Sequence, residues 1–279
     1  MLLGGIALVS VIAAAIIGIG AEGTSWMWMI PVLTLGFVLA GVVLAFLFLL
    51  VLASAVDLKK EQKEDSKLYR KTVELYLQSA LRPLRWHIKT NGMEKVPTDG
   101  RFLLVCNHVS LADPVVLLRA FTGKQLAFIS KRENQSMFLV GKVMHKMLCQ
   151  PINRENDKEA LKTIIKCIQI LREDKASVAV FPEGYIHEDK KLHHFRSGVF
   201  KIATKTEVPI VVCTLKNTKD AISNLLHYKR TDIEVHVLKT IPAEEYKGIT
   251  TVELGERIYK LMAEDLGPEN VAQEIASDT

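Results

Sequence analysis

The first 56 residues contain one ionisable side chain, Glu22, and no Lys or Arg. Residues 57–279 hold all 36 Lys and Arg residues and 30 of the 31 Asp and Glu residues, which gives them a net charge of +6. A helix formed by so apolar a run has no polar face to present to water. The sequence therefore predicts a membrane anchor over residues 1–56, joined to a charged globular region that is long enough to bury a core.

The anchor divides into two apolar runs. Residues 1–21 have about the length that crosses a bilayer as a helix, roughly 20 residues. Residues 26–56 would extend about 46 Å as a helix, longer than the roughly 30 Å hydrocarbon core, so this helix is expected to tilt. The linker "EGTS" is short enough for a hairpin, and Trp26 and Trp28 lie where an interfacial aromatic belt is expected.

The distribution of lysines predicts the orientation of this transmembrane hairpin. Lys59, Lys60, Lys63 and Lys67 follow the second run, whereas no basic side chain precedes the first. The positive-inside rule then places residues 57–279 on the cytoplasmic side of a cell membrane, expected to be bacterial. A cleaved signal peptide is the alternative for the first run, although the basic n-region is missing and cleavage would leave the domain on the same side.

Beyond the anchor, strand and helix patterns alternate. Residues 57–84 are typical of a charged, amphipathic helical linker, which could lie on the membrane surface or pack on the domain. Strands are predicted over residues 101–106, 125–130, 177–181, 209–215 and 232–238, and helices over 114–121, 136–148, 157–174 and 251–265. This order predicts an α/β domain over residues 85–265, with a central, mostly parallel sheet flanked by helices, and a polar tail over 266–279.

The clearest helical pattern covers residues 157–174. Asn156 and Glu159 form a plausible helix start. One apolar stripe follows helical spacing through Leu161, Ile164, Ile165, Ile168 and Leu171.

Four widely spaced cysteines show no CxxC pair: Cys106, Cys149, Cys167 and Cys213. All four lie in apolar or mixed stretches, which favours reduced and mostly buried thiols, as a cytoplasmic location implies.

The stretch "VCNHVSLADP" (105–114) places His108 and Asp113 directly after a predicted buried strand. The carboxyl ends of such strands are where α/β proteins build their sites. Asp113 is expected to cap the helix that Pro114 begins. A carboxylate has two oxygens and could also accept a hydrogen bond from an imidazole, which would then present its other nitrogen as a base. The spacing by itself favours a helix cap over a catalytic pair of histidine and aspartate.

Three further stretches carry candidate groups. "FPEGYIH" (181–187) follows another buried strand and places Glu183 at its end, with Gly184 allowing close backbone approach. "QPINREN" (150–156) places Arg154 just before a helix start, a natural position for an anion. "VPIVV" (208–212) is a core strand.

Taken together, these blocks resemble the lysophosphatidic acid acyltransferase family of membrane-bound glycerolipid acyltransferases. The family's NHxxxxD block matches Asn107-His108 and Asp113, its glycine-then-arginine block Gly141 and Arg154, its FPEG block residues 181–184, and its VPI strand residues 208–210. The resemblance covers roughly residues 85–265, and NHxxxxD followed by FPEG behind a membrane anchor is a specific combination.

The resemblance implies an acyltransferase that makes phosphatidic acid in phospholipid biosynthesis. His108 would take the proton of the free hydroxyl of a 1-acylglycerol-3-phosphate while Asp113 orients the imidazole. The donor would be acyl-CoA or an acyl carrier protein, with no cofactor and no acyl-enzyme. Arg154 would hold the acceptor phosphate, and Glu183 and Gly184 would shape the acceptor site, to which Asn107 is also assigned.

The chain departs from the family directly after FPEG. Many members continue with Thr-Arg-Ser, whereas this chain has Tyr185, Ile186 and His187. A basic group for phosphate is therefore missing at its usual place, and Lys131, Arg132 or Arg196 are the possible substitutes. This departure leaves the acceptor open among another lysophospholipid, glycerol-3-phosphate and an aminolipid.

Other classes of function are disfavoured. His187, His193 and His194 fit no standard metal-ligand spacing, so no metal is predicted. The sequence lacks a Gly-rich phosphate loop, and its basic residues do not cluster with aromatic ones, which argues against nucleotide cofactors and nucleic acid. A non-catalytic membrane scaffold and a hydrolase that uses His108 to activate water remain as alternatives.

Overall fold

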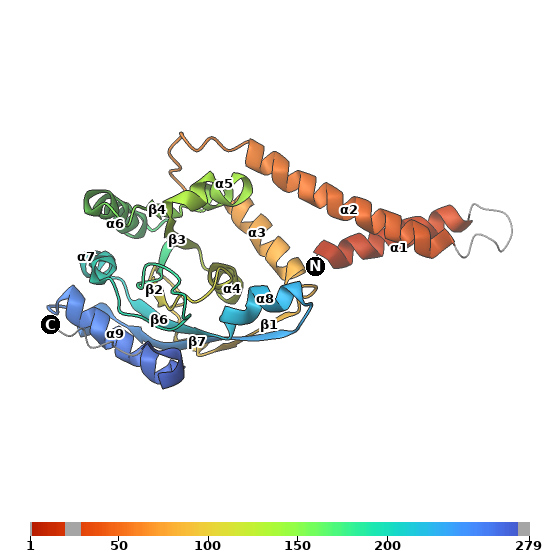
Figure 1. The fold of residues 1–279 in the computed structure, drawn as a ribbon. Coiled ribbons are helices and arrows are strands. Elements are labelled where there is room, and N and C mark those ends of the chain that lie inside the picture. Colours follow the sequence, from red (N-terminus) through yellow and green to blue (C-terminus); the bar gives the residue numbers. More distant parts are fainter. Residues whose placement is uncertain (1, 20–28, 273–279) are drawn as a thin grey trace.

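The computed structural model describes residues 2–19 and 29–272. Two apolar helices, α1 (Leu2–Ile19) and α2 (Met29–Ser54), form a hairpin that projects from an α/β domain (Figure 1). They pack closely, since a Cβ at Gly41 would lie 2.5 Å from Cγ2 of Ile6. Within the described residues, Pro31–Ser54 is the one stretch that is long and apolar enough to cross a membrane, and the apolar part of α1, Gly4–Ile17, is shorter. Glu22, the linker "EGTS", Trp26 and Trp28 lie outside the described residues.

The predicted linker is helical only in its second half. α3 (Lys67–Ala80) begins ten residues later than expected. Its tyrosines anchor it to α2, because the hydroxyl of Tyr69 donates to the carbonyl of Leu52 (2.7 Å) and that of Tyr76 to the carbonyl of Ala45 (2.6 Å). The linker therefore packs between the hairpin and the domain.

A seven-stranded sheet forms the centre of the domain, in the order β1-β7-β6-β2-β5-β3-β4. All neighbouring pairs are parallel except β6 and β7. Its strands are β1 (Trp86–Asn91), β2 (Leu103–Cys106), β3 (Leu126–Lys131), β4 (Gln150–Ile152), β5 (Ser177–Val180), β6 (Ile210–Lys216) and β7 (Thr231–Ile241). The predicted mostly parallel sheet is confirmed.

Helices cover both faces of the sheet (Figure 1). The layer on the left of the view contains α6 (Asp157–Arg172), α7 (Lys201–Thr206) and α9 (Thr251–Leu266). The side that carries the hairpin contains α3, α4 (Asp113–Ala120), α5 (Phe138–Lys146) and α8 (Ala221–Leu226).

Each central strand of the sheet contributes side chains to two hydrophobic cores. Leu103 and Val105 of β2 pack in the core under α6, α7 and α9, whereas Leu104 and Cys106 pack in the core under α4. Because alternate side chains of a strand point to opposite faces, a strand covered on both sides must be apolar throughout. This is why these strands appear in the sequence as continuous apolar runs.

Four elements were not predicted: β1, β4, α7 and α8. Each has only three to six residues. The equally short β2 and β5 were predicted because they are buried throughout and form continuous apolar runs, whereas β1 and β4 are only partly buried, and α7 and α8 have fewer than two turns. Their structure is set by the neighbours they pair with or pack against.

The stripe predicted on α6 is only partly buried. Ile164 and Leu171 pack in the core, but Leu161 is 49% exposed and Ile165 is 45% exposed. Asn156 caps the helix as predicted, with its side chain accepting from the N–H of Glu159 (3.2 Å).

Candidate active site

His108 and Asp113 lie side by side beyond the carboxyl end of β2. Nδ1 of His108 is 2.9 Å from Oδ2 of Asp113. The carboxylate is fully buried, whereas the imidazole is 15% exposed. Since an ionised carboxylate only accepts hydrogen bonds, Nδ1 carries the hydrogen, and Nε2 is left with a lone pair.

The prediction that Asp113 caps a helix is wrong. Asp113 is itself the first residue of α4, and Ala112 occupies the cap position. Oδ2 accepts from the N–H groups of Val109 and Ser110 (2.8 Å each), which belong to the loop before the helix. The loop folds back over the carboxylate, so a single buried oxygen holds both the loop and the imidazole.

Phe181 packs against one face of the His108 imidazole. The two rings are stacked, with centroids 4.1 Å apart and planes 16° from parallel. β5 lies beside β2 in the sheet, with Val105 opposite Val180, so "FPEG" follows β5 directly next to His108. The sequence contains this phenylalanine in a recognised block, but its contact with His108 depends on the strand order.

Glu183 links the loop of His108 to a second loop. Oε1 accepts from the N–H of His108 (2.7 Å), and Oε2 accepts from the N–H of His193 (3.0 Å). The side chain is buried, and this burial raises the pKa of Glu183 to about 8, against the two N–H groups that favour the carboxylate. Glu183 therefore positions backbone on both sides and has no exposed oxygen for a substrate.

Asn107 likewise bonds to backbone. Its amide nitrogen donates to the carbonyl of Leu215 (3.1 Å), and its amide oxygen accepts from the N–H of the same residue (2.7 Å). The side chain is buried. Asn107 thus fastens the end of β2 to β6, and its predicted contact with substrate stays untested.

Gly184 makes room for Arg196. Its φ is +91°, and a Cβ at this position would lie 3.0 Å from Nε of Arg196. The N–H of Arg196 donates to the carbonyl of Pro182 (2.9 Å), and its guanidinium lies over the ring of Tyr185, 6.0 Å from the centroid. Arg196 is thereby held against the block from which the expected basic residue is missing.

Arg154 and Arg196 are near enough for their charges to interact. The positive charge of Arg196 and, more strongly, partial burial lower the pKa of Arg154, while Glu133 opposes both. Within residues 2–19 and 29–272, neither guanidinium forms an ion pair. Two neighbouring guanidinium groups without ion-pair partners have the chemistry to bind a doubly charged anion.

The other predicted cations are placed differently. Lys131 is 57% exposed and lies 3.3 Å from Glu133, and Arg132 lies 3.3 Å from Glu159. Gly141 acts indirectly, since a Cβ there would lie 2.2 Å from the carbonyl oxygen of Gln135 and push the segment from Arg132 to Ser136 away from α5.

An open hollow of about 490 Å³ lies beside Arg196. It is lined by Tyr185, Ile186, His187, Glu188, Asp189 and His193. His187 and His193 stack with centroids 3.5 Å apart, and Asp189 accepts from Nε2 of His193 (2.9 Å). Three of the lining residues, Tyr185, Ile186 and His187, are those at which the chain departs from the pattern after FPEG.

No cysteine is placed to act as a nucleophile. All four are free and buried, as predicted. Burial and the neighbouring Cys213 raise the pKa of the Cys106 thiol well above its ordinary value, and burial raises the pKa of Cys149 to about 11. Such thiols stay protonated and inert. Among the described residues there is no group of three His, Cys, Asp or Glu side chains that could hold a metal ion.

The comparisons with known proteins converge. Residues 87–216 match the family model described as Acyltransferase. The chain is 30% identical over 182 residues to a chloroplastic 1-acyl-sn-glycerol-3-phosphate acyltransferase of Arabidopsis thaliana, covering 65% of this chain and 50% of that protein. It is 25% identical over 180 residues to the 1-acyl-sn-glycerol-3-phosphate acyltransferase of Borreliella burgdorferi, covering 62% and 71%.

A third relative is a probable 1-acyl-sn-glycerol-3-phosphate acyltransferase of Mycoplasma pneumoniae, 32% identical over 145 residues, with 50% of this chain and 53% of that protein covered. The chain thus spans about half the length of several curated relatives it matches. Among solved structures, the 1-acyl-sn-glycerophosphate acyltransferase PlsC of Thermotoga maritima has the same fold, with a TM-score of 0.60 at 20% identity over 78% of this chain and 85% of that one.

Proposed function

The chain carries an acyltransferase domain of the 1-acylglycerol-3-phosphate acyltransferase family, and on that premise we propose that it transfers a fatty acyl group from a thioester to the free hydroxyl of 1-acylglycerol-3-phosphate, forming phosphatidic acid. The observation that carries the proposal is the pairing of His108 with a fully buried carboxylate, 2.9 Å away, beside two uncompensated arginines. The imidazole of His108 can remove a proton, and the two arginines can hold a phosphate.

His108 is the general base. Its Nδ1–H is fixed by Asp113, so Nε2 is the nitrogen that takes the proton from the acceptor hydroxyl. The carboxylate stabilises the imidazolium that forms. Phe181 against the ring and the Glu183 bond to the N–H of His108 prevent the imidazole from turning away.

The transfer needs no covalent enzyme intermediate. The deprotonated hydroxyl oxygen attacks the thioester carbonyl carbon, a C–O bond forms, and the C–S bond breaks. The leaving sulfur takes the proton from the His108 imidazolium, which returns the base to its neutral form. The inert cysteines agree with this direct route, because none provides a thiolate.

Arg154 and Arg196 hold the phosphate of the acceptor. Their guanidinium groups can each donate two parallel hydrogen bonds to phosphate oxygens. Arg196 supplies the basic group that the Tyr185-Ile186-His187 stretch does not. A hydrolase acting on a thioester would have no use for this pair, and a scaffold would have no use for a buried carboxylate aimed at an imidazole.

We propose that the hairpin anchors this site at a bilayer, which its apolar helices support. Both α1 and α2 meet the domain at the same end, through contacts with α3 and α5, and extend away from it together (Figure 1). Because both the acceptor and the acyl chain are amphiphiles, an anchor that holds the domain at the membrane surface raises their local concentration. We assign the domain to the cytoplasmic side from the lysines that follow α2.

Acyl transfer by the purified full chain tests the function. A labelled acyl thioester is offered with a panel of acceptors in mixed micelles: 1-acylglycerol-3-phosphate, other lysophospholipids, glycerol-3-phosphate and an aminolipid. We expect the highest kcat/KM with 1-acylglycerol-3-phosphate. Transfer to none of them, with release of free fatty acid instead, would support the hydrolase and contradict the proposal.

A further inference from the structure

The turn between α8 and β7 exposes apolar side chains that the proposed reaction does not use. Leu226 is 81% exposed and Tyr228 is 65% exposed. Ile222 of α8 is 43% exposed and lies on the same face of the helix as Leu226, four residues earlier. Aliphatic and aromatic side chains that are exposed together at one turn mark a contact surface.

A second turn, between α3 and β1, lies against the first and is basic. The carbonyl of Arg85 accepts from the N–H of Thr231 (3.0 Å), and its guanidinium donates to the carbonyl of Tyr228 (3.1 Å) and lies 5.1 Å from the centre of the Tyr228 ring. Arg82 and Lys229 are exposed beside them in the sequence. Within residues 2–19 and 29–272, Arg82, Arg85 and Lys229 form no ion pair.

The two turns carry little acidic charge. Residues 75–93 and 221–232 contain five Lys and Arg residues and one acidic residue, Asp232. Asp232 is paired with Arg230 (2.6 Å), and Asp220 lies at the opposite end of α8 from the turn. The apolar tip therefore has a basic rim, a composition that binds the interface of a bilayer containing anionic lipids.

Both turns have backbone conformations that are uncommon for large side chains. The φ angles of Tyr228 and Arg85 are +50° and +57°, in the left-handed region. The two residues hold each other in place, and the N–H of Lys229 donates to the carbonyl of Asn224 (2.7 Å). These bonds keep the turn in a shape that leaves Leu226 and Tyr228 uncovered.

The turns lie at the edge of the sheet that carries the site. β2 and β6 are parallel and β6 and β7 antiparallel, so β7 and its parallel neighbour β1 begin where β2 ends. His108 follows β2, which lies two strands, or about 10 Å, from β7. Figure 1 shows both turns at the end of the domain from which the hairpin projects.

We propose that these two turns form a second membrane contact. The tip at Leu226 and Tyr228 enters the interface of the bilayer, and the basic residues around it bind the phosphates of anionic lipids. The inference rests on the proposed anchoring by the hairpin, which brings the turns to the bilayer. A hairpin alone lets the domain tilt, whereas a second contact holds the edge with His108 at the surface in which the acceptor is dissolved.

Depth measurements on the full chain in vesicles test this contact. Leu226→Cys carries a thiol-reactive fluorophore, which labels this position selectively because the four native cysteines are buried. The vesicles are an equimolar mixture of phosphatidylglycerol and phosphatidylcholine with a lipid that bears a nitroxide on its acyl chain. We expect the nitroxide to quench the probe, about twofold more strongly in this mixture than in phosphatidylcholine alone.

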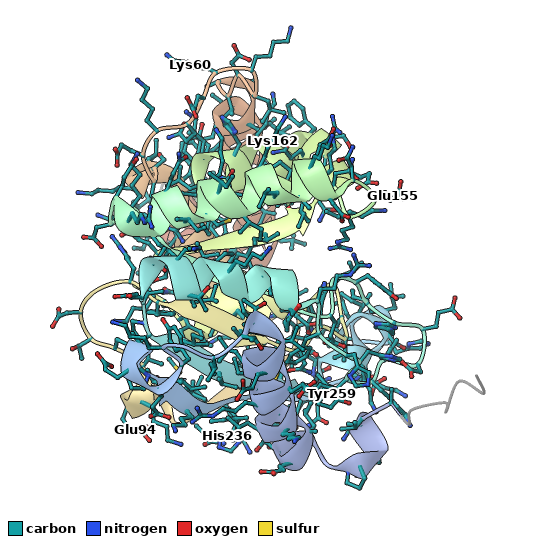
Figure 2. All side chains as sticks on the ribbon, turned by 90° about the vertical axis from the view of Figure 1, so that its left-hand side faces the viewer. Lys60, Glu94, Glu155, Lys162, His236 and Tyr259 are labelled. Carbon is teal, nitrogen blue, oxygen red and sulfur yellow. The ribbon has the colours of Figure 1, made fainter. Side chains whose placement is uncertain are left out.

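Two reference positions calibrate the depth. Leu44→Cys places the probe on an exposed position of α2, within the proposed anchor, and Val252→Cys places it on α9, where Val252 is 55% exposed. α9 lies in the layer on the side of the sheet opposite the hairpin, which Figure 2 views from outside with Tyr259 labelled on that helix. Quenching at residue 226 should lie between a high value at residue 44 and a value near zero at residue 252.

The basic rim is tested in the same assay. Arg82→Gln combined with Lys229→Gln should lower the quenching at residue 226 in the mixed vesicles to the value found in phosphatidylcholine alone, and added salt should act in the same direction. Lys260→Gln, which removes an exposed lysine of α9, is the matched control and should leave the quenching unchanged.

A probe at residue 226 that stays unquenched while the probe at residue 44 is quenched would overturn the inference and leave the hairpin anchor in place. Equal quenching at residues 226 and 252 would also overturn it, as would an emission shift that follows protein concentration and not lipid, since that indicates a second copy of the chain. No quenching at residue 44 would overturn the anchor and the inference together. Acyl transfer is measured separately in mixed micelles, so a failure of the enzymatic function is distinguished from a failure of the contact.

Discussion

The two halves of the proposed active site, the base side around His108 and the phosphate side around Arg154, are built in opposite ways. On the base side, Asp113 and Glu183 are buried, and their carboxylates accept four backbone N–H groups and the imidazole of His108. On the phosphate side, Arg154 is half-buried, Arg196 is exposed, and neither guanidinium has a carboxylate partner among the described residues.

This difference follows from what each half must do. A base has to present one nitrogen in one direction, so its bonds are all made before the substrate arrives. A phosphate clamp has to gain its bonds from the substrate, so its charges are left unpaired. Substitutions on the base side should therefore act on kcat, and those on the phosphate side on KM.

The largest effect is expected from His108→Ala. Loss of the general base should lower kcat by about 10³-fold. The protein should still fold, because Oδ2 of Asp113 keeps its bonds from the N–H groups of Val109 and Ser110. His227→Ala is the control, because His227 lies exposed at the end of α8. Transfer at the wild-type rate would remove His108 from its role.

Asp113→Asn separates charge from shape. The amide oxygen can still accept from Val109 and Ser110, while its nitrogen would take the place of Oδ1, which is buried without a partner. We expect near-wild-type melting and a kcat lowered about 100-fold, because the imidazolium loses its counter-charge. Asp232→Asn, on the exposed end of β7, controls for loss of one carboxylate. Unaltered activity would leave Asp113 with a structural role only.

Arg154→Ala tests the phosphate side. Loss of charge-assisted bonds should raise KM for 1-acylglycerol-3-phosphate about 10- to 100-fold and change kcat much less. Arg119→Ala, an exposed arginine of α4, is the matched control. A fall in kcat at unchanged KM would contradict the division between the two halves.

Glu183→Gln tests the cost of the buried carboxyl. The pKa of Glu183 is raised from 4.5 to about 8, so the folded protein favours the protonated carboxyl. The contribution of this group to the free energy of unfolding is complete below pH 4.5 and is lost as the pH rises towards 8. The loss is no more than about 5 kcal/mol. The melting temperature of the wild-type protein should therefore fall as the pH rises over this range.

The glutamine side chain of the variant does not titrate, so its melting temperature should depend less on pH. At low pH the variant should melt at a lower temperature than the wild type, because an amide cannot accept from both N–H groups. Equal pH slopes for the two proteins would show that Glu183 is ionised throughout.

The smallest effect is expected from Lys131→Ala. Lys131 is mostly exposed, and its charge is shared with Glu133, so KM for the acceptor should rise by no more than about threefold. The test uses the same assay as for Arg154. A rise in KM as large as that of Arg154→Ala would show that Lys131, at the end of β3, also binds the phosphate.

Sequence patterns predicted the fold class, the long helices and the strands buried on both faces, because a long helix repeats its period and a fully buried strand is a continuous apolar run. They also predicted that His108, Asp113 and Glu183 lie at one edge of the sheet, because the ends of parallel strands meet there. The elements β1, β4, α7 and α8 show neither a long period nor a fully apolar run, and β1 pairs with a strand far along the chain.

What the sequence alone determined about this protein is local: an apolar run without charges, strands buried on both faces, and a histidine and an aspartate after one of them. What only the tertiary structure decided is which groups meet. The bonds of Asn107 to Leu215 and of Glu183 to His108 and His193 join separate loops, and the position of Arg196 beside residues 181–184 depends on the room that Gly184 leaves. The exposure of Leu161 and Ile165 likewise follows from how α6 lies on the sheet, since a periodic stripe shows that a helix has an apolar side but not how much of that side its neighbours cover.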